Sequence, residues 1–435
     1  MYEVPKCLIS FIFVLGMVTL TGRRVLVLLW HPHPYGATAG GFRVIYEILR
    51  RVKCNGGLAV DVLDVEPSFL VEGRCVKIHE YSIPTFVDRV CKNNVLLARI
   101  LEWLMTAGLL TYYALRMHKK RPYDVVYVAC AELWFTGLPA LFFGWLFNVK
   151  VKLAILNVEV AGGTLGGYYS ALRQMGHATL NSFIIATFTF MLSAFYSALI
   201  NRANEIVTIS TDLMNAIRRR GVRTKTTIMR IGIDFQTIQN IPVQEKKFDG
   251  IFVGRLSAEK GIYDLVKAWK IVAARKPDAR LLIVGSTDLG ADRLIQVINE
   301  NHLESNIEIF VSGSTMDSGS ENDRRRKVLR LLKMSRLVVF LSRIEGWGLV
   351  PLEGLACGLP VVAYALPVYK EHIRACDVAF LVPIGDYQKA ATVILDILNK
   401  QQSELQEMSR KAKDFASQYD WDRLAGSAIR IIVEL

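Results

Sequence analysis

Short runs of apolar and β-branched residues alternate with longer amphipathic stretches along the chain. This alternation is typical of parallel βαβ units, because a buried parallel strand reads as a continuous apolar run. The longer stretches have helical spacing, as from Ile262 to Ala273, where the apolar residues share one face. The predicted strands are Val25–Trp30, Ala59–Leu63, Val125–Cys130, Lys152–Leu156, Glu205–Ile209 and Thr226–Met229 in the first half, and Gly250–Val253, Arg280–Val284, Ile307–Val311, Leu337–Leu341, Val361–Tyr364 and Ala379–Val382 in the second.

Two such sets of strands predict an α/β protein made of two doubly wound, Rossmann-like domains. The chain has 435 residues, more than one compact core usually holds. The predicted boundary is the polar stretch Gln236–Lys247, which contains Pro242. Two such lobes facing each other create a cleft at the carboxyl ends of their strands, where ligands bind.

The balance of charges indicates an anionic partner. The net charge is +13, which suits a nucleic acid, a phosphorylated substrate or acidic lipid headgroups. No recognised nucleic-acid-binding module is present, so we expect no nucleic acid. The seven cysteines form no C-x-x-C pair, and we expect buried free thiols in a reducing compartment and no zinc site.

Several apolar stretches raise the question of membrane contact. Residues 1–22 include the run Cys7–Thr21, which predicts either a weak anchor or a chain whose true start is Met17. Asn181–Ile200 contains no charge, and it is either a helix buried on all sides or one that lies against a bilayer. The basic stretch Arg218–Lys225 that follows favours the bilayer, since each basic residue near an anionic leaflet adds about 1 kcal/mol of attraction.

A second apolar stretch supports the same surface. Leu96–Leu115 is rich in Leu, Trp and Tyr, and basic residues follow it in Arg116–Arg121. We therefore expect a protein that associates peripherally with an anionic membrane surface, at its cytoplasmic face.

The chemistry is concentrated after the predicted strand Leu337–Leu341. A glycine-rich turn carries Glu345, Gly346 and Gly348, and a short helix then begins near Leu349. Glycines allow backbone N–H groups to approach a ligand, and a helix N-terminus directs positive potential at the same place, so this turn suits a diphosphate. Glu345 and, eight positions later, Glu353 can each accept two hydroxyl hydrogen bonds from a sugar ring or a ribose.

This stretch closely resembles the motif of the retaining glycosyltransferase family 4, whose members have the two-lobed GT-B fold. The resemblance rests on the run from Ser342 to Ala363, SRIEGWGLVPLEGLACGLPVVA. A second element agrees with it, because Gly254–Gly261 matches the family's G-R-L-x-x-x-K-G. The resemblance implies that Arg255 and Lys260 neutralise the donor's diphosphate, together with the start of the helix at Leu349 and Val350.

Weaker matches extend the resemblance to the rest of the chain. Gly40 and Gly41 resemble the family's glycine turn near the donor phosphate and the acceptor, and Ser312 and Gly313 fall where relatives hold the nucleobase. The helix that begins after Tyr419 crosses back to the first lobe in relatives. The implied domains are therefore 23–240 with 421–435, which binds the acceptor, and 247–420, which binds the nucleotide sugar.

Two departures from the family pattern stand out. Ile231 replaces the asparagine of an N-G-x-D element, and the histidine that many relatives place after the strand at Lys152–Leu156 is missing. Asn157 or Glu159 is a candidate to substitute for that histidine on the acceptor side.

The resemblance implies a retaining hexosyltransferase that uses a UDP- or GDP-sugar and needs neither a metal nor another cofactor. Glu345, Lys260 and Arg255 are the expected catalytic residues, and Glu353 is expected to hold the ribose. The acceptor is expected to be a lipid-linked molecule or a glycan. The alternative is a non-catalytic GT-B subunit that binds a membrane or a partner protein. A nicotinamide dehydrogenase is disfavoured because no G-x-G-x-x-G follows a predicted strand.

Overall fold

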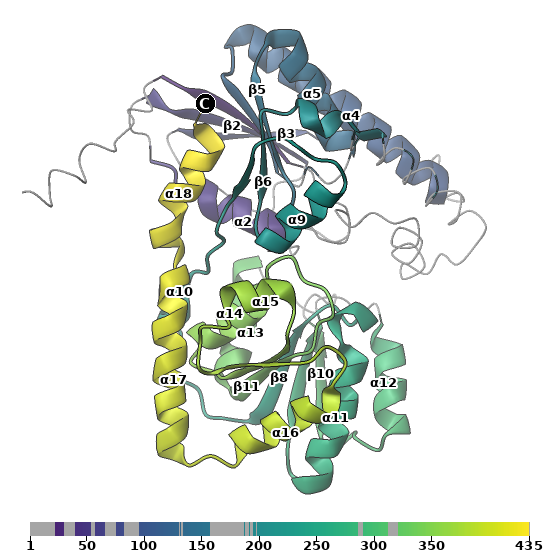
Figure 1. The fold of residues 1–435 in the computed structure, drawn as a ribbon, viewed down its shortest axis with the longest axis vertical. Coiled ribbons are helices and arrows are strands. Elements are labelled where there is room, and N and C mark those ends of the chain that lie inside the picture. Colours follow the sequence, from purple (N-terminus) through teal and green to yellow (C-terminus); the bar gives the residue numbers. More distant parts are fainter. Residues whose placement is uncertain are drawn as a thin grey trace, which may run out of the picture.

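In the computed structural model of the protein, two sheets, each with helices, form two lobes (Figure 1). The structure describes residues 22–29, 40–53, 57–65, 75–81, 95–129, 131, 134–156, 187, 191, 195–196, 198–285, 290–311 and 321–434.

The first lobe is built on a seven-stranded parallel sheet with the strand order β3-β2-β1-β4-β5-β6-β7. Its strands are β1 (Arg24–Leu28), β2 (Ala59–Val65), β3 (Val76–Tyr81), β4 (Val125–Val128), β5 (Lys150–Ala154), β6 (Glu205–Thr208) and β7 (Thr226–Ile228). Its helices include α2 (Gly40–Leu49), α4 (Val95–Lys120), α5 (Trp134–Phe147) and α9 (Thr211–Arg219), with a 3-10 turn at Ile200–Arg202.

The second lobe is built on a six-stranded parallel sheet with the order β10-β9-β8-β11-β12-β13. Its strands are β8 (Phe248–Gly254), β9 (Leu281–Gly285), β10 (Ile307–Val311), β11 (Ser335–Phe340), β12 (Val361–Tyr364) and β13 (Ala379–Val382). Its helices are α10 (Phe235–Asn240), α11 (Ile262–Arg275), α12 (Ala291–Glu300), α13 (Glu321–Lys333), α14 (Leu349–Ala356), α15 (Pro367–His372), α16 (Tyr387–Leu398) and α17 (Gln402–Ala416), with a 3-10 turn at Ala258–Lys260.

In each sheet the strand order reverses at one point. The chain adds strands in one direction from β1 and from β8, and in the other direction from β4 and from β11. Loops at the carboxyl ends of such neighbouring strands splay to opposite faces of the sheet and leave room for a ligand. The pairs β1–β4 and β8–β11 therefore mark where sites are expected.

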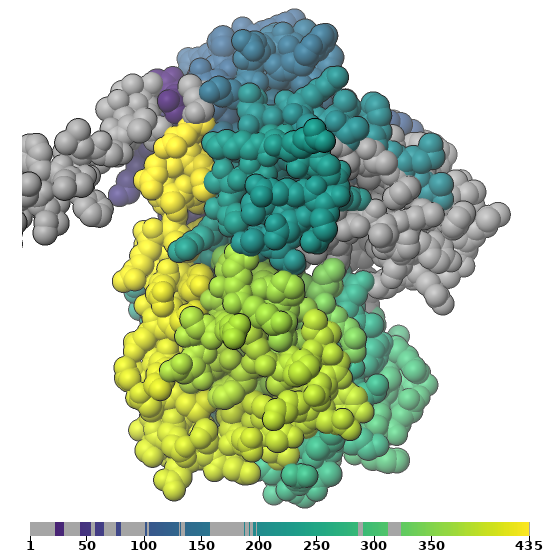
Figure 2. All heavy atoms as spheres, in the orientation of Figure 1, coloured from purple at the N-terminus to yellow at the C-terminus, as the bar shows by residue number. Residues whose placement is uncertain are grey.

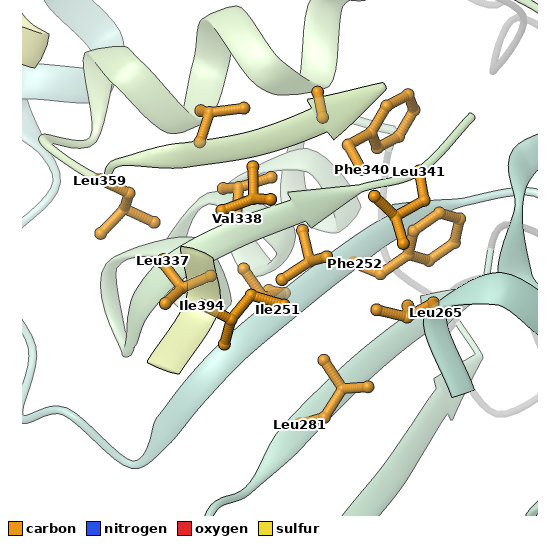
Figure 3. Close-up of a cluster of buried hydrophobic side chains, with 14 of the residues drawn as sticks. Ile251, Phe252, Leu265, Leu281, Leu337, Val338, Phe340, Leu341, Leu359 and Ile394 are labelled. Carbon is orange, nitrogen blue, oxygen red and sulfur yellow. The ribbon is translucent and has the colours of Figure 1, made fainter. Parts of the chain in front are cut away.

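A close-packed core fixes the carboxyl ends of β8 and β11. Ile251, Phe252, Val338 and Phe340 from these strands interdigitate with side chains of the covering helices (Figure 3). The rings of Phe252 and Phe340 stack at a centroid distance of 5.6 Å. Dense packing of this kind resists small displacements, so the loops that leave these strands have a rigid base.

The C-terminal helices join the two lobes along one side of the molecule (Figures 1 and 2). α17 packs on the second lobe, and α18 (Trp421–Val433) lies against α2 of the first lobe. The main chain is paired at the crossing, because Ile233 N donates to Tyr419 O at 2.8 Å and Trp421 N donates to Ile233 O at 3.0 Å. Trp421 is buried in the first core, so the predicted return of the C-terminal helix is confirmed.

Each strand expected from the sequence is present, and among the described residues one further strand, β3, was not expected. β3 pairs with β2 at the edge of the first sheet. Its sequence, VKIHEY, alternates apolar and polar residues because Lys77 faces solvent. A half-exposed edge strand lacks the continuous apolar run that marks a parallel strand buried on both faces.

Two further expectations meet the structure only in part. Cys75 is disulfide-bonded, so the expectation that all the cysteines are free thiols is wrong at this position, whereas Cys357 and Cys376 are free and buried. In the stretch 181–200, Tyr196 is buried and donates to Ala131 O at 2.8 Å, whereas Phe195 is exposed. Residues 1–21 and most of 181–199 lie outside the described residues.

Within the described part of the chain, no helix is both long and apolar enough to cross a membrane.

Candidate active site

The two motif turns lie side by side because they leave neighbouring strands. β8 ends at Gly254 and its turn carries Arg255 and Lys260, while β11 ends at Phe340 and its loop carries Glu345. The two motifs, far apart in sequence, therefore meet at the point where the strand order of the second sheet reverses.

Main-chain hydrogen bonds hold the two turns together. The backbone N–H of Arg343 donates to Glu259 O at 2.8 Å, and the Ser342 hydroxyl donates to the same oxygen at 3.3 Å. Gly261 follows with a φ of +68°, and a Cβ there would lie 1.7 Å from the carbonyl oxygen of Leu341. Only glycine fits between the turns, and it sets the position of the neighbouring Lys260.

Lys260 and Glu345 form a direct ion pair. Lys260 Nζ lies 2.6 Å from Glu345 Oε1, and the side chains are 16% and 11% exposed. Hydrogen bonds between two ionised groups are short and strong, and shielding from water strengthens them. The arrangement holds a cation and an anion ready, side by side, for a ligand that carries both phosphate and hydroxyl groups.

Arg255 lies at the rim of the same turn. Its side chain is 47% exposed and its Nη2 lies 3.9 Å from Glu259 Oε2. A half-exposed guanidinium keeps most of its hydration and can turn towards a bidentate anion such as a diphosphate.

The loop after Glu345 makes contact with the first lobe. A Cβ on Gly346 would lie 2.7 Å from the carbonyl oxygen of Leu156, just beyond β5. Gly348 has a φ of +88° and caps α14, and a Cβ there would lie 2.3 Å from the ring of Tyr369. Leu349 packs against both cores. The first turn of α14, with Leu349 and Val350, therefore begins where the lobes meet, and its N–H groups have no acceptors within the helix.

Glu353 lies deeper on α14 and has a cationic partner that the sequence did not reveal. The carboxylate is buried, and Arg325 Nη2 on α13 lies 3.2 Å from its Oε1. In the sequence, the basic run at 324–327 has the composition of a solvent-exposed helix face, and no local pattern indicates which of its members contacts Glu353.

A second network that sequence reasoning missed supports the Glu345 loop. Asp264 on α11 accepts hydrogen bonds from Arg343 Nη2 at 2.6 Å and from the Tyr364 hydroxyl at 2.9 Å. Burial, and then the hydrogen bond to the Asp264 carboxylate, raise the pKa of Tyr364. The signal was a lone aspartate within the apolar face of α11, since a buried carboxylate requires partners.

Two aromatic residues of α15 line the other side of the loop. The Tyr369 hydroxyl is fully buried, and burial followed by the charge of Glu345 raises its pKa well above the usual value. The ring of His372 lies 3.6 Å from that of Trp347, measured between centroids. Burial, with a smaller contribution from Arg230, lowers the pKa of His372 to about 4, so this histidine is neutral at pH 7.

The predicted residues of the first lobe are only partly described. Gly40 and Gly41 begin α2, after the carboxyl end of β1 and therefore beside the point where the first sheet reverses. Asn157 and Glu159, the acceptor-side candidates, lie outside the described residues, and so do Ser312 and Gly313. Those four assignments stay predictions.

Among the residues that the structure describes, no cluster of three or more His, Cys, Asp or Glu side chains could hold a metal ion.

Solved structures identify the fold. The chain aligns over 94% of its length with sucrose-phosphate synthase from Thermosynechococcus elongatus, covering 98% of that chain, at a TM-score of 0.67 and 16% identity. Anabaena HepE, solved in complex with UDP and glucose, aligns over 94% of this chain and 99% of its own at a TM-score of 0.63 and 17% identity. WaaG, a glycosyltransferase of lipopolysaccharide biosynthesis, aligns over 94% of this chain and all of its own at 0.60 and 15% identity. The predicted GT-B fold is confirmed.

Most of the second lobe matches the model of a known family. Residues 234–415 match the model of the family described as glycosyl transferases group 1. N-acetyl-alpha-D-glucosaminyl L-malate synthase of Bacillus anthracis is 27% identical over 213 residues, 44% of this chain and 51% of that protein. GDP-mannose:cellobiosyl-diphosphopolyprenol alpha-mannosyltransferase of Xanthomonas campestris is 22% identical over 180 residues, 41% of this chain and 45% of that protein. The matched part thus spans about half the length of these relatives.

Proposed function

We propose that this protein is a retaining, metal-independent hexosyltransferase that uses a nucleotide-diphosphate sugar, UDP- or GDP-linked. The carrying observation is the Lys260–Glu345 ion pair, held where the sheet order reverses and beside the start of α14. The likeness of the second lobe to group 1 glycosyltransferases supports this proposal, and so does the likeness of the whole chain to GT-B structures.

The proposed mechanism assigns a separate role to each charged side chain. Arg255, Lys260 and the first N–H groups of α14 stabilise the negative charge that develops on the diphosphate as its bond to the sugar C1 breaks. Glu345 orients the sugar hydroxyls and stabilises positive character in the ring. The acceptor oxygen bonds to C1 on the face that the diphosphate leaves, and its proton passes to the departing phosphate. Glu353 holds the ribose.

The test measures donor binding and turnover in the same samples. A panel of UDP-, GDP- and ADP-sugars is titrated by calorimetry and assayed for hydrolysis or transfer. Lys260→Ala and Glu345→Ala should each reduce turnover by about 10²- to 10³-fold, because each removes a group aimed at developing charge. Lys389→Ala, an exposed lysine on α16, is the control and should behave as wild type.

Two outcomes would overturn the proposal. Near-normal turnover in both variants would exclude the assigned roles. Absence of binding to every nucleotide sugar would instead favour the non-catalytic GT-B subunit.

The acceptor is proposed to be lipid-linked or a glycan, reached at the cytoplasmic face of an anionic membrane. Among the described residues, most of the large exposed apolar side chains belong to the first lobe. They are Leu104 and Tyr112 on α4, Phe142, Trp145 and Leu146 on α5, and Met191 and Phe195. Trp145 is 77% exposed. Tryptophan and tyrosine side chains suit the interface between headgroups and acyl chains.

The charges on α4 also support a membrane-facing surface on the first lobe. Exposed positions recur every four residues, with Leu104 and Tyr112 followed by Arg116 and Lys120. The two helices α4 and α5 pack against each other, so the apolar and basic positions belong to one part of the first lobe (Figure 1). Basic residues at the end of an apolar stripe match an anionic headgroup layer.

Co-sedimentation with vesicles tests this surface. At low salt the full chain should bind vesicles with anionic lipid and should bind zwitterionic vesicles weakly. Trp145→Ser should weaken that binding several-fold, whereas Ile295→Ser, at an exposed apolar residue on α12 of the second lobe, should not. A wild-type protein that stays in the supernatant with anionic vesicles would rule out the membrane surface.

A further inference from the structure

The helix α13 places one arginine beside the carboxylate proposed to bind ribose. Arg325 Nη2 lies 3.2 Å from Glu353 Oε1, and the side chains are 15% and 9% exposed. Arg326, the next residue on the helix, is exposed. The ion pair with Glu353 therefore distinguishes Arg325 from its exposed neighbour Arg326.

The Arg325–Glu353 ion pair compensates the cost of burying the Glu353 carboxylate. An ionised carboxylate shielded from water is unfavourable unless an opposite charge or hydrogen bonds compensate it. A guanidinium compensates the negative charge without using all the acceptor positions of the carboxylate, because a carboxylate can accept about four hydrogen bonds. It can hold an arginine and two vicinal hydroxyls at once, with the arginine fixing the direction in which the other acceptor positions point.

Arg325 itself makes fewer hydrogen bonds than a buried guanidinium normally does. Its Nη1 and Nη2 atoms are both shielded from solvent, and neither has a hydrogen bond of good geometry to any described residue. Buried guanidinium N–H groups are costly to leave without hydrogen bonds. The contact with Glu353 is therefore an ion pair with room to tighten when the carboxylate turns towards a ligand.

We infer that Arg325 is a positioning residue that orients Glu353 to accept hydrogen bonds from the 2′- and 3′-hydroxyls of the donor's ribose. The inference rests on the proposed function, since it assumes a nucleotide donor. Arg325 acts through Glu353, so its effect appears as selectivity for the ribose and not as a loss of chemistry on the sugar.

The test compares UDP and GDP with their 2′-deoxy counterparts by calorimetry. Wild type should prefer the ribonucleotide. Arg325→Met should weaken binding of the ribonucleotide by about 10- to 100-fold, the size of a lost hydrogen bond to a charged group. Binding of the deoxynucleotide should change much less, so the preference for ribose is lost. In turnover assays the donor KM should rise while kcat is largely kept.

Two further variants separate positioning from a general structural effect. Arg325→Lys keeps the charge but not the planar fork, and should recover part of the ribose preference. Arg326→Met, the exposed neighbour, should match wild type. Circular dichroism checks the fold, and if Arg325→Met does not fold, the ratio measured in Arg325→Lys decides.

The outcomes distinguish this inference from the proposed function. If wild type binds neither nucleotide, the proposed function and the inference both fail. If wild type binds but Arg325→Met weakens ribo- and deoxynucleotide equally, or weakens neither, the positioning role alone is excluded.

Discussion

The two lobes contain the same small network in two different places. In each lobe a buried aspartate accepts hydrogen bonds from an arginine and from a tyrosine hydroxyl. The distances from arginine Nη2 to aspartate Oδ2 are 2.5 and 2.6 Å, and those from the hydroxyl are 2.8 and 2.9 Å. The residues are Asp61, Arg24 and Tyr123 in the first lobe, and Asp264, Arg343 and Tyr364 in the second.

The position of each network on its sheet decides what it supports. Arg24 is the first residue of β1 and Tyr123 precedes β4, so the first network joins the amino ends of strands, away from the site. Arg343 follows the carboxyl end of β11 and Tyr364 ends β12, so the second network holds the loop of Glu345. Identical chemistry therefore stabilises the sheet in one lobe and the candidate site in the other.

The largest expected effect comes from one glycine in each lobe. Gly261 and Gly221 have φ values of +68° and +87°, but a Cβ would strike Leu341 O at Gly261 and would meet nothing within 4 Å at Gly221. Gly221→Ala should cost about 1–2 kcal/mol of unfolding free energy, from backbone strain alone. Gly261→Ala should cost more than about 3 kcal/mol and abolish turnover, because the clash displaces Lys260.

Urea unfolding measures both glycine variants. Equal losses of stability in the two would show that the second-lobe turn is as open as the first-lobe one, and would remove the packing argument for Lys260.

The aspartates give the next largest effect. Asp61→Asn and Asp264→Asn should each destabilise the fold by about 2 kcal/mol, less than for a fully buried pair because the arginines are partly exposed. Only Asp264→Asn should also weaken donor binding, which calorimetry measures. A loss of donor binding in Asp61→Asn would contradict the division between sheet and site.

His372 gives a pH-dependent effect at the junction between the lobes. Its pKa falls to about 4 because of burial, whereas an unfolded histidine titrates near pH 6.5. Between these values the unfolded chain binds a proton that the folded chain does not. Stability is therefore full above about pH 6.5 and is lost as the pH falls towards 4, by on the order of 2 kcal/mol.

Thermal unfolding from pH 7 to pH 4 tests the histidine. His372→Gln should have a flatter profile than wild type over this range. Parallel profiles for the two proteins would show that His372 does not titrate with unfolding.

The smallest effect concerns a contact between lobes. Glu371 of α15 accepts hydrogen bonds from Thr211 N at 2.9 Å and from its Oγ1 at 3.0 Å, at the start of α9 in the first lobe. Glu371→Gln should cost about 0.5 kcal/mol, since a negative charge favours a helix N-terminus. Ser210→Ala, which removes the cap of α9 within one lobe, should cost about 1 kcal/mol. Differential scanning calorimetry measures both, and a larger loss in Glu371→Gln would mean that the lobes depend strongly on this contact.

The sequence predicted most of the fold because parallel strands are buried on both faces and read as apolar runs. β3 escaped because an edge strand is half exposed. In the candidate site, the glycines and charges of each turn were predictable, since each motif lies within one strand–turn–helix unit. The pair Lys260–Glu345 became a contact only through the adjacency of β8 and β11.

Partners on separate elements could not be predicted. Arg325 reaches the site from α13, and nothing in its neighbouring residues reveals its direction. Asp264 could be noticed as a carboxylate within the apolar face of α11, but its partner Arg343 could not be predicted. The acceptor-side candidates Asn157 and Glu159 lie outside the described residues and stay predictions.

The return of α18 to the first lobe affects the order in which the two lobes can fold during synthesis. Trp421, Ala428, Ile432 and Val433 are buried in the core of the first lobe, although every other buried residue of that core precedes residue 350. A ribosome therefore releases the strands of the first lobe long before it releases the helix that covers them. The second lobe, whose core uses residues 233–416, is ready to fold earlier. The lobe that is translated first is the lobe that is finished last.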